Sequence, residues 1–181
     1  MTGNEIRQRL PYAGLPIVAA VLLVIQAGRV ETFILLRNEM LIVFGYIASV
    51  LDLRFRKIPN TLVLSMLGAW VFLMTLILCL DTGAAIGLLW DSVLGFVLGG
   101  GLFLLTYLIS RKGLGGGDVK LMACTGLYLG FYGIIPAIFC GTLLAALTGL
   151  ALILAKKLGR KDMIPLAPFL FVGILITVFL Q

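Results

Sequence analysis

The sequence predicts an all-α fold, a polytopic bundle of about six to seven transmembrane helices. Of its 181 residues, 61% are apolar and only 12% are charged, whereas a soluble domain carries about 25% charged residues. The mean hydropathy is +1.16. Because so few charges cannot cover a water-exposed surface, these values exclude a soluble globular domain and a disordered tail. Since each span needs about 20 apolar residues, we expect a single membrane domain over residues 1–181.

Apolar runs set the predicted spans, and polar or glycine-rich stretches separate them. An alternative for residues 1–27 is a cleaved signal peptide, but Ile25 fits a small-residue cleavage site poorly, so we favour a retained span. The run 119–131 is short for a crossing, so it either extends or dips into the bilayer. Gly95 and Gly99 form a G-x-x-x-G motif, which we interpret as simple close packing of helices. The predicted spans are residues 14–36, 40–53, 61–80, 86–109, 119–131, 133–155 and 163–180.

Clusters of basic residues mark the cytoplasmic ends of these spans, because membrane proteins keep lysine and arginine on that side. The clusters fall on alternate loops, which places the amino terminus inside, whereas the stretch 81–91 has acidic but no basic residues and lies outside. This distribution explains the net charge of +6 without nucleic acid as a partner. The clusters are Arg7 and Arg9, then Arg54, Arg56 and Lys57, then Arg111, Lys112 and Lys120, and finally Lys156, Lys157, Arg160 and Lys161.

The chain contains no histidine, which excludes Ser-His and Cys-His nucleophilic pairs and the HExxH zinc motif. Its three cysteines, Cys79, Cys124 and Cys140, stand singly in apolar runs, so no C-x-x-C pair suggests zinc or redox chemistry. A glycine-rich phosphate-binding loop is also missing from the sequence. We therefore expect neither a metal nor another cofactor.

Two of the eight acidic residues differ from the rest in their place within the predicted spans. Asp52 ends the second run and Asp118 opens the fifth, so both lie near the cytoplasmic face, at a depth where an ionisable group is costly and indicates function. Taken singly, Asp118 could be a helix N-cap and Asp52 could pair with Arg54 or Arg56. Together, in a chain without histidine, they predict a paired-carboxylate site. The other six are interpreted as solvated or interfacial charge at ends and loops: Glu5, Glu31, Glu39, Asp81, Asp91 and Asp162.

A carboxylate pair is suited to the hydrolysis of a peptide bond. Two adjacent carboxyl groups cannot both ionise easily, so they share a proton. The ionised group takes a proton from water, and the neutral group donates its proton to the peptide carbonyl oxygen. Because a helix N-terminus favours an anion and a C-terminus favours a neutral acid, we predict Asp118 as the base and Asp52 as the acid. The glycines before Asp118 leave room for an extended peptide.

Three segments resemble motifs of the type IV prepilin peptidase family and occur in the family's order. GLGGGDVKLM (113–122) resembles its G-x-G-D motif, LDLRFRKIPN (51–60) its first aspartate segment, and IPLAPFLFVG (164–173) its proline-containing segment near the carboxy terminus. The resemblance implies a peptidase core over residues 40–181, an extra N-terminal span over 1–39, and Asp52 and Asp118 as the catalytic pair. The candidate substrate-binding residues in these motifs are Gly115, Gly116, Gly117, Lys120, Pro59, Pro165 and Pro168.

The resemblance implies a membrane aspartyl endopeptidase of the inner (cytoplasmic) membrane. Its expected partners are membrane lipid and prepilin or pilin-like membrane proteins, whose short basic leader it would remove at the cytoplasmic face. Longer family members add a cytoplasmic domain with paired cysteines that is linked to N-methylation. This chain shows no such region, so we expect no methyltransferase activity. Arg56 and Lys120 also fit a role as topology signals, which we favour over substrate contact.

A second hypothesis comes from a different class of protein. In a small assembly or transport subunit, Asp52 and Asp118 would bind a cation or relay protons. The geometry of the two carboxyl groups discriminates these hypotheses, because a peptidase needs both within reach of one water molecule. Presenilin-like proteases share G-x-G-D but look less similar, since the tyrosine before their first aspartate is here Leu51. The sequence does not predict an oligomeric state.

Overall fold

The computed structural model describes residues 32–110, 114–156 and 164–180, and within these ranges the regular structure is helical. Of these helices, α2 to α5 are long and apolar enough to cross a membrane, and α6 is a shorter apolar helix. The prediction of an all-α, polytopic membrane bundle is therefore confirmed. The helices are α2 (Thr32–Phe55), α3 (Asn60–Leu80), α4 (Thr82–Ser110), α5 (Gly116–Leu154) and α6 (Ala167–Leu180).

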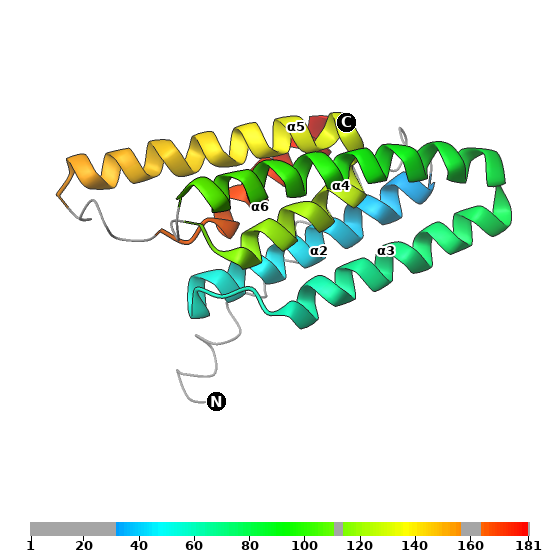
Figure 1. Cartoon of the computed structure of the whole chain (residues 1–181), viewed down its shortest axis with the longest axis horizontal. Helices are drawn as coiled ribbons and strands as arrows, with labels where there is room; N and C mark the ends of the chain where they lie inside the picture. The colour runs from blue at the N-terminus through cyan, green and yellow to red at the C-terminus, as the bar shows by residue number, and fades with distance from the viewer. Residues whose placement is uncertain (1–31, 111–113, 157–163, 181) are drawn as a thin grey trace.

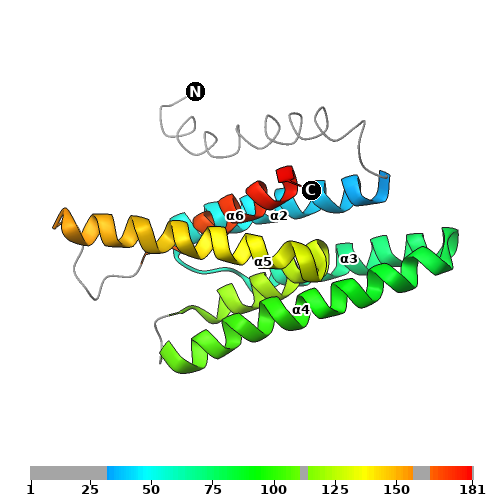
Figure 2. The same cartoon turned by 90° about the horizontal axis from the view of Figure 1, so that it is seen from above.

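The helices run roughly along the long axis of the bundle, so each helix has one end towards either side (Figure 1). We call one side the inner end; there α2, α4 and α5 end and α3, α5 and α6 begin. At the opposite end, α3 and α4 form a hairpin that turns at Asp81, whose Oδ1 accepts the backbone N–H of Ala84 at 3.0 Å and caps α4. α5 contacts both the α3–α4 hairpin and the pair formed by α2 and α6 (Figure 2).

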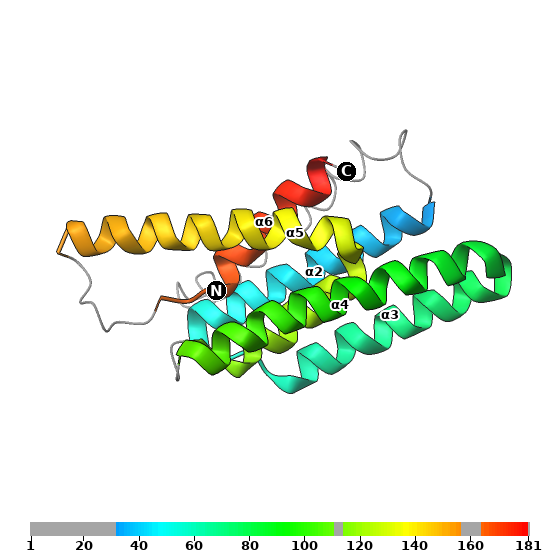
Figure 3. The ribbon, with the colours of Figure 1, turned by 45° about the horizontal axis from the view of Figure 1, so that its top comes forward.

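The chain doubles back in the middle of α5, at Gly130. This glycine has a φ of 70°, in the left-handed region, and separates two helical halves. The second half returns to the inner end beside α4 and α6, as Figure 3 shows in yellow to orange. The predicted runs 119–131 and 133–155 correspond to these halves. The first run ends at Gly130 and does not extend to Pro136, which lies inside the second half.

Glycines bring α4 and the first half of α5 into close backbone contact. A Cβ atom added to Gly95 would overlap the carbonyl oxygen of Gly126, and one added to Gly99 would lie 2.6 Å from the carbonyl oxygen of Met122. Larger residues at these positions would force the two helices apart. The G-x-x-x-G motif is thus confirmed as a close-packing motif.

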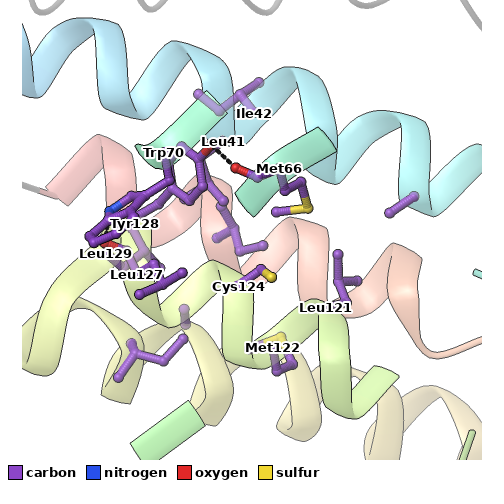
Figure 4. Packing of buried hydrophobic residues seen from close by; sticks show 14 of the residues in the cluster. Leu41, Ile42, Met66, Trp70, Leu121, Met122, Cys124, Leu127, Tyr128 and Leu129 are labelled. Atoms are coloured by element: carbon purple, nitrogen blue, oxygen red, sulfur yellow. Dashed lines mark hydrogen bonds between the residues drawn. The ribbon is translucent and has the colours of Figure 1, made fainter. Parts of the chain in front are cut away.

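The core joins α3 to the first half of α5 through apolar packing, shown in Figure 4, and through two buried hydrogen bonds. The indole N–H of Trp70 donates to the carbonyl oxygen of Leu127 at 3.0 Å. The hydroxyl of Tyr128 donates to the carbonyl oxygen of Met66 at 2.7 Å. Because each polar group is satisfied in an apolar setting, these bonds fix the register of the two helices. They thereby fix the start of α5 relative to α3.

The structure corrects the predicted boundary between the first two spans. α2 begins at Thr32 and runs without a break, so residues 32–36 belong to the same helix as the predicted run 40–53. The polar residues between them suggested an interruption, but Arg37 and Asn38 are only 7% and 1% exposed and pack inside the bundle. The rest of the predicted first span, including the signal-peptide alternative, lies outside the described residues.

Two acidic residues that were expected at ends or loops also lie inside helices. Glu39 is half-buried in α2, because that helix starts earlier than predicted. Asp91 is half-buried in the third turn of α4, which starts directly after its cap at Asp81. Asp81 itself is exposed at the turn, as expected. Glu5, Glu31 and Asp162 lie outside the described ranges.

Candidate active site

Asp52 lies in the last turn of α2, at the inner end, and is 8% exposed. The helix ends at Phe55, and the next residue, Arg56, has a φ of 51°. The backbone N–H of Arg56 donates to the carbonyl oxygen of Asp52 at 2.9 Å, which closes the helix end. The Oδ2 atom of Asp52 accepts the backbone N–H of Ala167, the first residue of α6, at 3.0 Å. Asp52 is therefore held between two helix ends.

Asp118 is the third residue of α5 and is half-buried. Gly115 occupies the N-cap position and no side chain caps the helix, so the alternative of Asp118 as an N-cap does not apply. The Oδ1 atom of Asp118 is buried and has no hydrogen-bond partner among the described residues. Its Oδ2 atom lies 2.9 Å from the point that a Cβ of residue 115 would occupy. Glycine at position 115 therefore leaves room for the carboxyl group.

Two cavities, of about 230 and 330 Å³, share four lining residues: Asp52, Arg56, Gly115 and Asp118. Both carboxyl groups thus face the same space, although they come from different helices. They are also close enough to interact electrostatically, so a state in which both are ionised is disfavoured. The smaller cavity is completed by Lys57, Ile58, Gly116 and Gly117, and the larger by Leu114, Ile164, Pro165 and Leu166.

The structure brings some of the predicted substrate-binding residues to these cavities. Gly115, Gly116 and Gly117 line the smaller cavity, and Pro165 lines the larger one. A Cβ atom added to Gly117 would lie 3.0 Å from the Cβ of Ile58. Glycine at this position keeps the loop before Asp118 close to the segment that follows Asp52.

The remaining predicted substrate-binding residues, Lys120, Pro59 and Pro168, line neither cavity. The exposed Lys120 donates from Nζ to the Oδ1 of Asn60 at 2.9 Å. Pro59 precedes the first residue of α3, and Pro168 is the second residue of α6. The two prolines therefore mark helix starts, where the fixed φ of proline suits the chain.

Sequence reasoning missed a backbone group and several apolar residues of the site. The backbone N–H of Ala167 binds Asp52, and four apolar residues complete the walls. Apolar side chains and backbone groups carry no recognisable chemical pattern in a sequence. The only feature that could have pointed to them was the proline before the start of α6. The missed wall residues are Ile58, Leu114, Ile164 and Leu166.

Fold and site together define a polytopic membrane protein in which a pair of carboxyl groups faces a cavity at one end of a helical bundle. Across residues 32–110, 114–156 and 164–180, no three histidine, cysteine or carboxylate side chains cluster as metal ligands would. The chain belongs to the type IV leader peptidase family, whose model matches residues 40–155. This range contains both Asp52 and Asp118, and the match confirms the family predicted from the motifs.

Two curated relatives both carry the name prepilin leader peptidase/N-methyltransferase. The protein from Bacillus subtilis is 32% identical over 133 residues, which cover 70% of this chain and 48% of the relative. The protein from Xanthomonas campestris pv. campestris is 33% identical over 124 residues, which cover 68% of this chain and 42% of the relative. The chain therefore spans about half the length of these relatives. No solved structure matches it significantly.

Proposed function

We propose that this protein is a membrane aspartyl endopeptidase that removes the short basic leader peptide of prepilin-like membrane proteins. The observation that carries the proposal is the convergence of Asp52 and Asp118, from two helices, on the same two cavities. Family membership supports the reaction, because the relatives are named prepilin leader peptidases. The glycine backbone beside Asp118 favours a peptide over a cation, since it leaves space for an extended chain.

The hydrogen bonds at the pair favour Asp52 as the base and Asp118 as the acid. The Ala167 N–H and the positive end of α6 both stabilise a negative charge on Asp52. Asp118 accepts a hydrogen bond from the backbone of Gly115, but its buried Oδ1 has no donor among the described residues. Burial without a donor at that oxygen disfavours a negative charge on the group. This assignment reverses the one that the ends of α2 and α5 predict, because the sequence does not reveal that α6 begins beside Asp52.

In the proposed reaction, Asp52 accepts a proton from water as the water oxygen attacks the scissile carbonyl carbon. Asp118 donates its proton to the carbonyl oxygen, which gives a neutral tetrahedral intermediate with two hydroxyl groups. The carbon–nitrogen bond then breaks as Asp52 passes its proton to the nitrogen and Asp118 recovers one from a hydroxyl group. The products are a carboxylic acid on the leader and a free amine on the mature protein. The pair is left with the single proton it started with.

The charge distribution supports placement of the active site at the cytoplasmic face of the inner membrane. Basic residues gather at the helix ends that form the inner end, where the pair lies. Residues 58–110, which include the turn at the opposite end, contain Asp81 and Asp91 and no lysine or arginine. Because positive charge is kept in the cytoplasm, the inner end faces that compartment. The described basic residues at this end are Arg54, Arg56, Lys57, Lys120 and Lys156.

The proposal covers the peptidase reaction without the N-methyltransferase activity in the names of the relatives. Cys79, Cys124 and Cys140 are free cysteines inside α3 and α5, so they do not form the cysteine pair expected of methylating members. To test for methyltransferase activity, the purified protein is incubated with the cleaved product and a methyl donor, and the new amino terminus is analysed by mass spectrometry. A mass gain that corresponds to one methylation would contradict the expected absence of this activity.

Co-expression with a prepilin-like membrane protein tests the peptidase. Asp52→Asn and Asp118→Asn should each leave the leader attached, because an asparagine amide can neither accept nor donate the proton that the two carboxyl groups exchange. Each variant should still accumulate in the membrane. Asp81→Asn is the control, since this exposed residue caps α4 at the opposite end and should process normally. Leader removal is read from gel mobility and from the amino-terminal sequence. Normal processing by either catalytic-pair variant would refute the proposal.

A further inference from the structure

Two residues other than glycine adopt a left-handed backbone conformation in the part of the chain that the structure describes. They are Arg56, with a φ of 51°, and Lys156, with a φ of 55°. Each follows the end of a helix at the inner end of the bundle. Glycine is the usual residue at such a position, because a Cβ atom disfavours the left-handed region. Strained backbone conformations cluster at functional sites.

The surroundings of these two cations differ. Arg56 lines both cavities together with Asp52 and Asp118. Its backbone N–H is bonded to the carbonyl oxygen of Asp52 at 2.9 Å, so the strained residue is joined directly to the helix that carries one catalytic group. Lys156 follows α5 and lines neither cavity. A topology signal alone explains Lys156, whereas Arg56 is part of the wall of both cavities.

We propose that Arg56 is a substrate-binding residue whose guanidinium group donates hydrogen bonds to backbone carbonyl oxygens of the peptide beside the scissile bond. The proposal rests on the peptidase function proposed above and names a group that recognises its substrate. A guanidinium has five N–H donors and no acceptor. A peptide that enters a cavity loses water from its carbonyl oxygens and needs donors in its place.

The walls of the cavities support this role for Arg56. Three side chains of the larger cavity, Leu114, Ile164 and Leu166, offer no hydrogen bonds. Of the residues that line this cavity, Arg56 alone carries a positive charge, and Lys57 lines only the smaller one. Arg56 is therefore the cation that both cavities share. Its planar fork of donors also fits carbonyl oxygens better than an ammonium group does.

Arg56→Gly and Lys156→Gly form a matched pair of variants. Each removes one cation and one strained backbone conformation at the same end of the bundle. The full chain is purified and assayed on a purified prepilin-like membrane protein. Neither variant should lower the thermal midpoint, since glycine suits the left-handed region. Arg56→Gly should raise KM by about tenfold or more, as expected for lost charged hydrogen bonds, with a smaller change in kcat. Lys156→Gly should keep both constants.

A wild-type KM for Arg56→Gly, or an equal rise for Lys156→Gly, would overturn the proposal and leave the peptidase function in place. If Arg56→Gly lowers the thermal midpoint, Arg56→Lys decides, because it keeps the charge and loses the planar fork. A raised KM for that variant supports the proposal, and a wild-type KM overturns it. Absence of cleavage by the wild-type protein would instead refute the proposed function itself.

A second substrate distinguishes backbone recognition from recognition of an acidic side chain. In this substrate, acidic side chains near the cleavage site are replaced by the corresponding amides. The ratio of KM between Arg56→Gly and the wild type should stay unchanged, because the backbone carbonyl oxygens are still present. A ratio that falls to one would show that Arg56 binds a carboxylate and would overturn the assignment to the backbone.

Discussion

Carboxyl groups occur inside apolar helices in two regions of the molecule, and the two regions use them differently. At the inner end, Asp52 and Asp118 line the same two cavities. Further along α4, Asp91 accepts the backbone N–H of Phe131 through Oδ1 at 3.0 Å, where α5 turns back. A Cβ atom added to Gly130 would overlap the Oδ2 of Asp91. Glycine at the turn therefore admits this carboxylate.

The comparison shows that an acidic residue inside an apolar helix is not by itself an active-site residue. Asp91 satisfies the first N–H group after the turn, as an N-cap does, but from a neighbouring helix. The charge of the buried Arg37 also attracts that of Asp91. Asp52 and Asp118, in contrast, line the two cavities at the inner end. Convergence of two acids on the same cavities, more than burial, distinguishes this pair from Asp91.

The largest expected effect, on the rate of cleavage, is at the inner end. Asp52→Ala and Asp118→Ala should each lower the rate of leader cleavage by on the order of 10³-fold or more, because each removes half of a unit that transfers protons. For the same reason, the double variant should be no slower than the slower single variant. Initial rates at equal amounts of folded protein provide the measurement. Effects that multiply in the double variant would contradict a shared site.

A smaller effect, on stability, is expected at the turn of α5. Gly130→Ala should lower the free energy of unfolding by about 3 kcal/mol, because the left-handed backbone and the overlap with Asp91 both disfavour a side chain. Gly68→Ala in α3 is the control, since an added Cβ would meet no heavy atom within 4 Å. Thermal or denaturant unfolding of the purified proteins measures both. Equal stability of the two variants would contradict the packing described at Gly130.

Asp91→Ala should lower the free energy of unfolding by less than Gly130→Ala does, about 1–2 kcal/mol, as for the loss of a helix cap. Asp91→Asn should lower it by a still smaller amount, because the side-chain oxygen of asparagine still accepts the Phe131 N–H. The folded fraction of either variant should cleave its substrate at a rate near that of the wild type. Activity per folded molecule is the deciding measurement. Loss of turnover in folded Asp91→Asn would place this residue in the catalytic machinery and remove the contrast between the regions.

The smallest effect is expected for Lys120→Met. The exposed Lys120 donates to Asn60, and exposed polar contacts of this kind contribute about 0.5 kcal/mol or less. Because Lys120 lines neither cavity, KM for the substrate should also stay at the wild-type value. A rise in KM as large as that of Arg56→Gly would restore the substrate-binding role that the motif predicted for Lys120.

The sequence predicted those features whose signals are local. The runs 61–80 and 86–109 correspond to α3 and α4, because length, apolar composition and the acidic turn between them are sufficient. Asp52 and Asp118 were predicted as a pair because the chain has no histidine and its basic residues indicate the same depth for both acids; the structure brings both to the same two cavities. The packing role of Gly95 and Gly99 also followed from their spacing.

Features that depend on contacts between distant segments were not predictable. Arg37 and Asn38 look like a break between spans, since the sequence does not show which neighbours enclose them. The backbone N–H of Ala167 has no chemical signature, and its bond to Asp52 appears only when α6 is placed beside α2. The bond from Phe131 to Asp91 likewise joins two helices whose relative position the sequence leaves open.

The turn at Gly130 also determines the sidedness of everything that follows it. The first half of α5, residues 116–130, is about 22 Å long at 1.5 Å per residue, which is short of the roughly 30 Å hydrocarbon core. Because the second half returns to the same end of the bundle, we expect residues 114 and 156 on one side of the membrane whether or not the hairpin reaches the far leaflet. We therefore expect the membrane topology of α6, and with it the contact of Ala167 with Asp52, to be independent of how deeply α5 inserts.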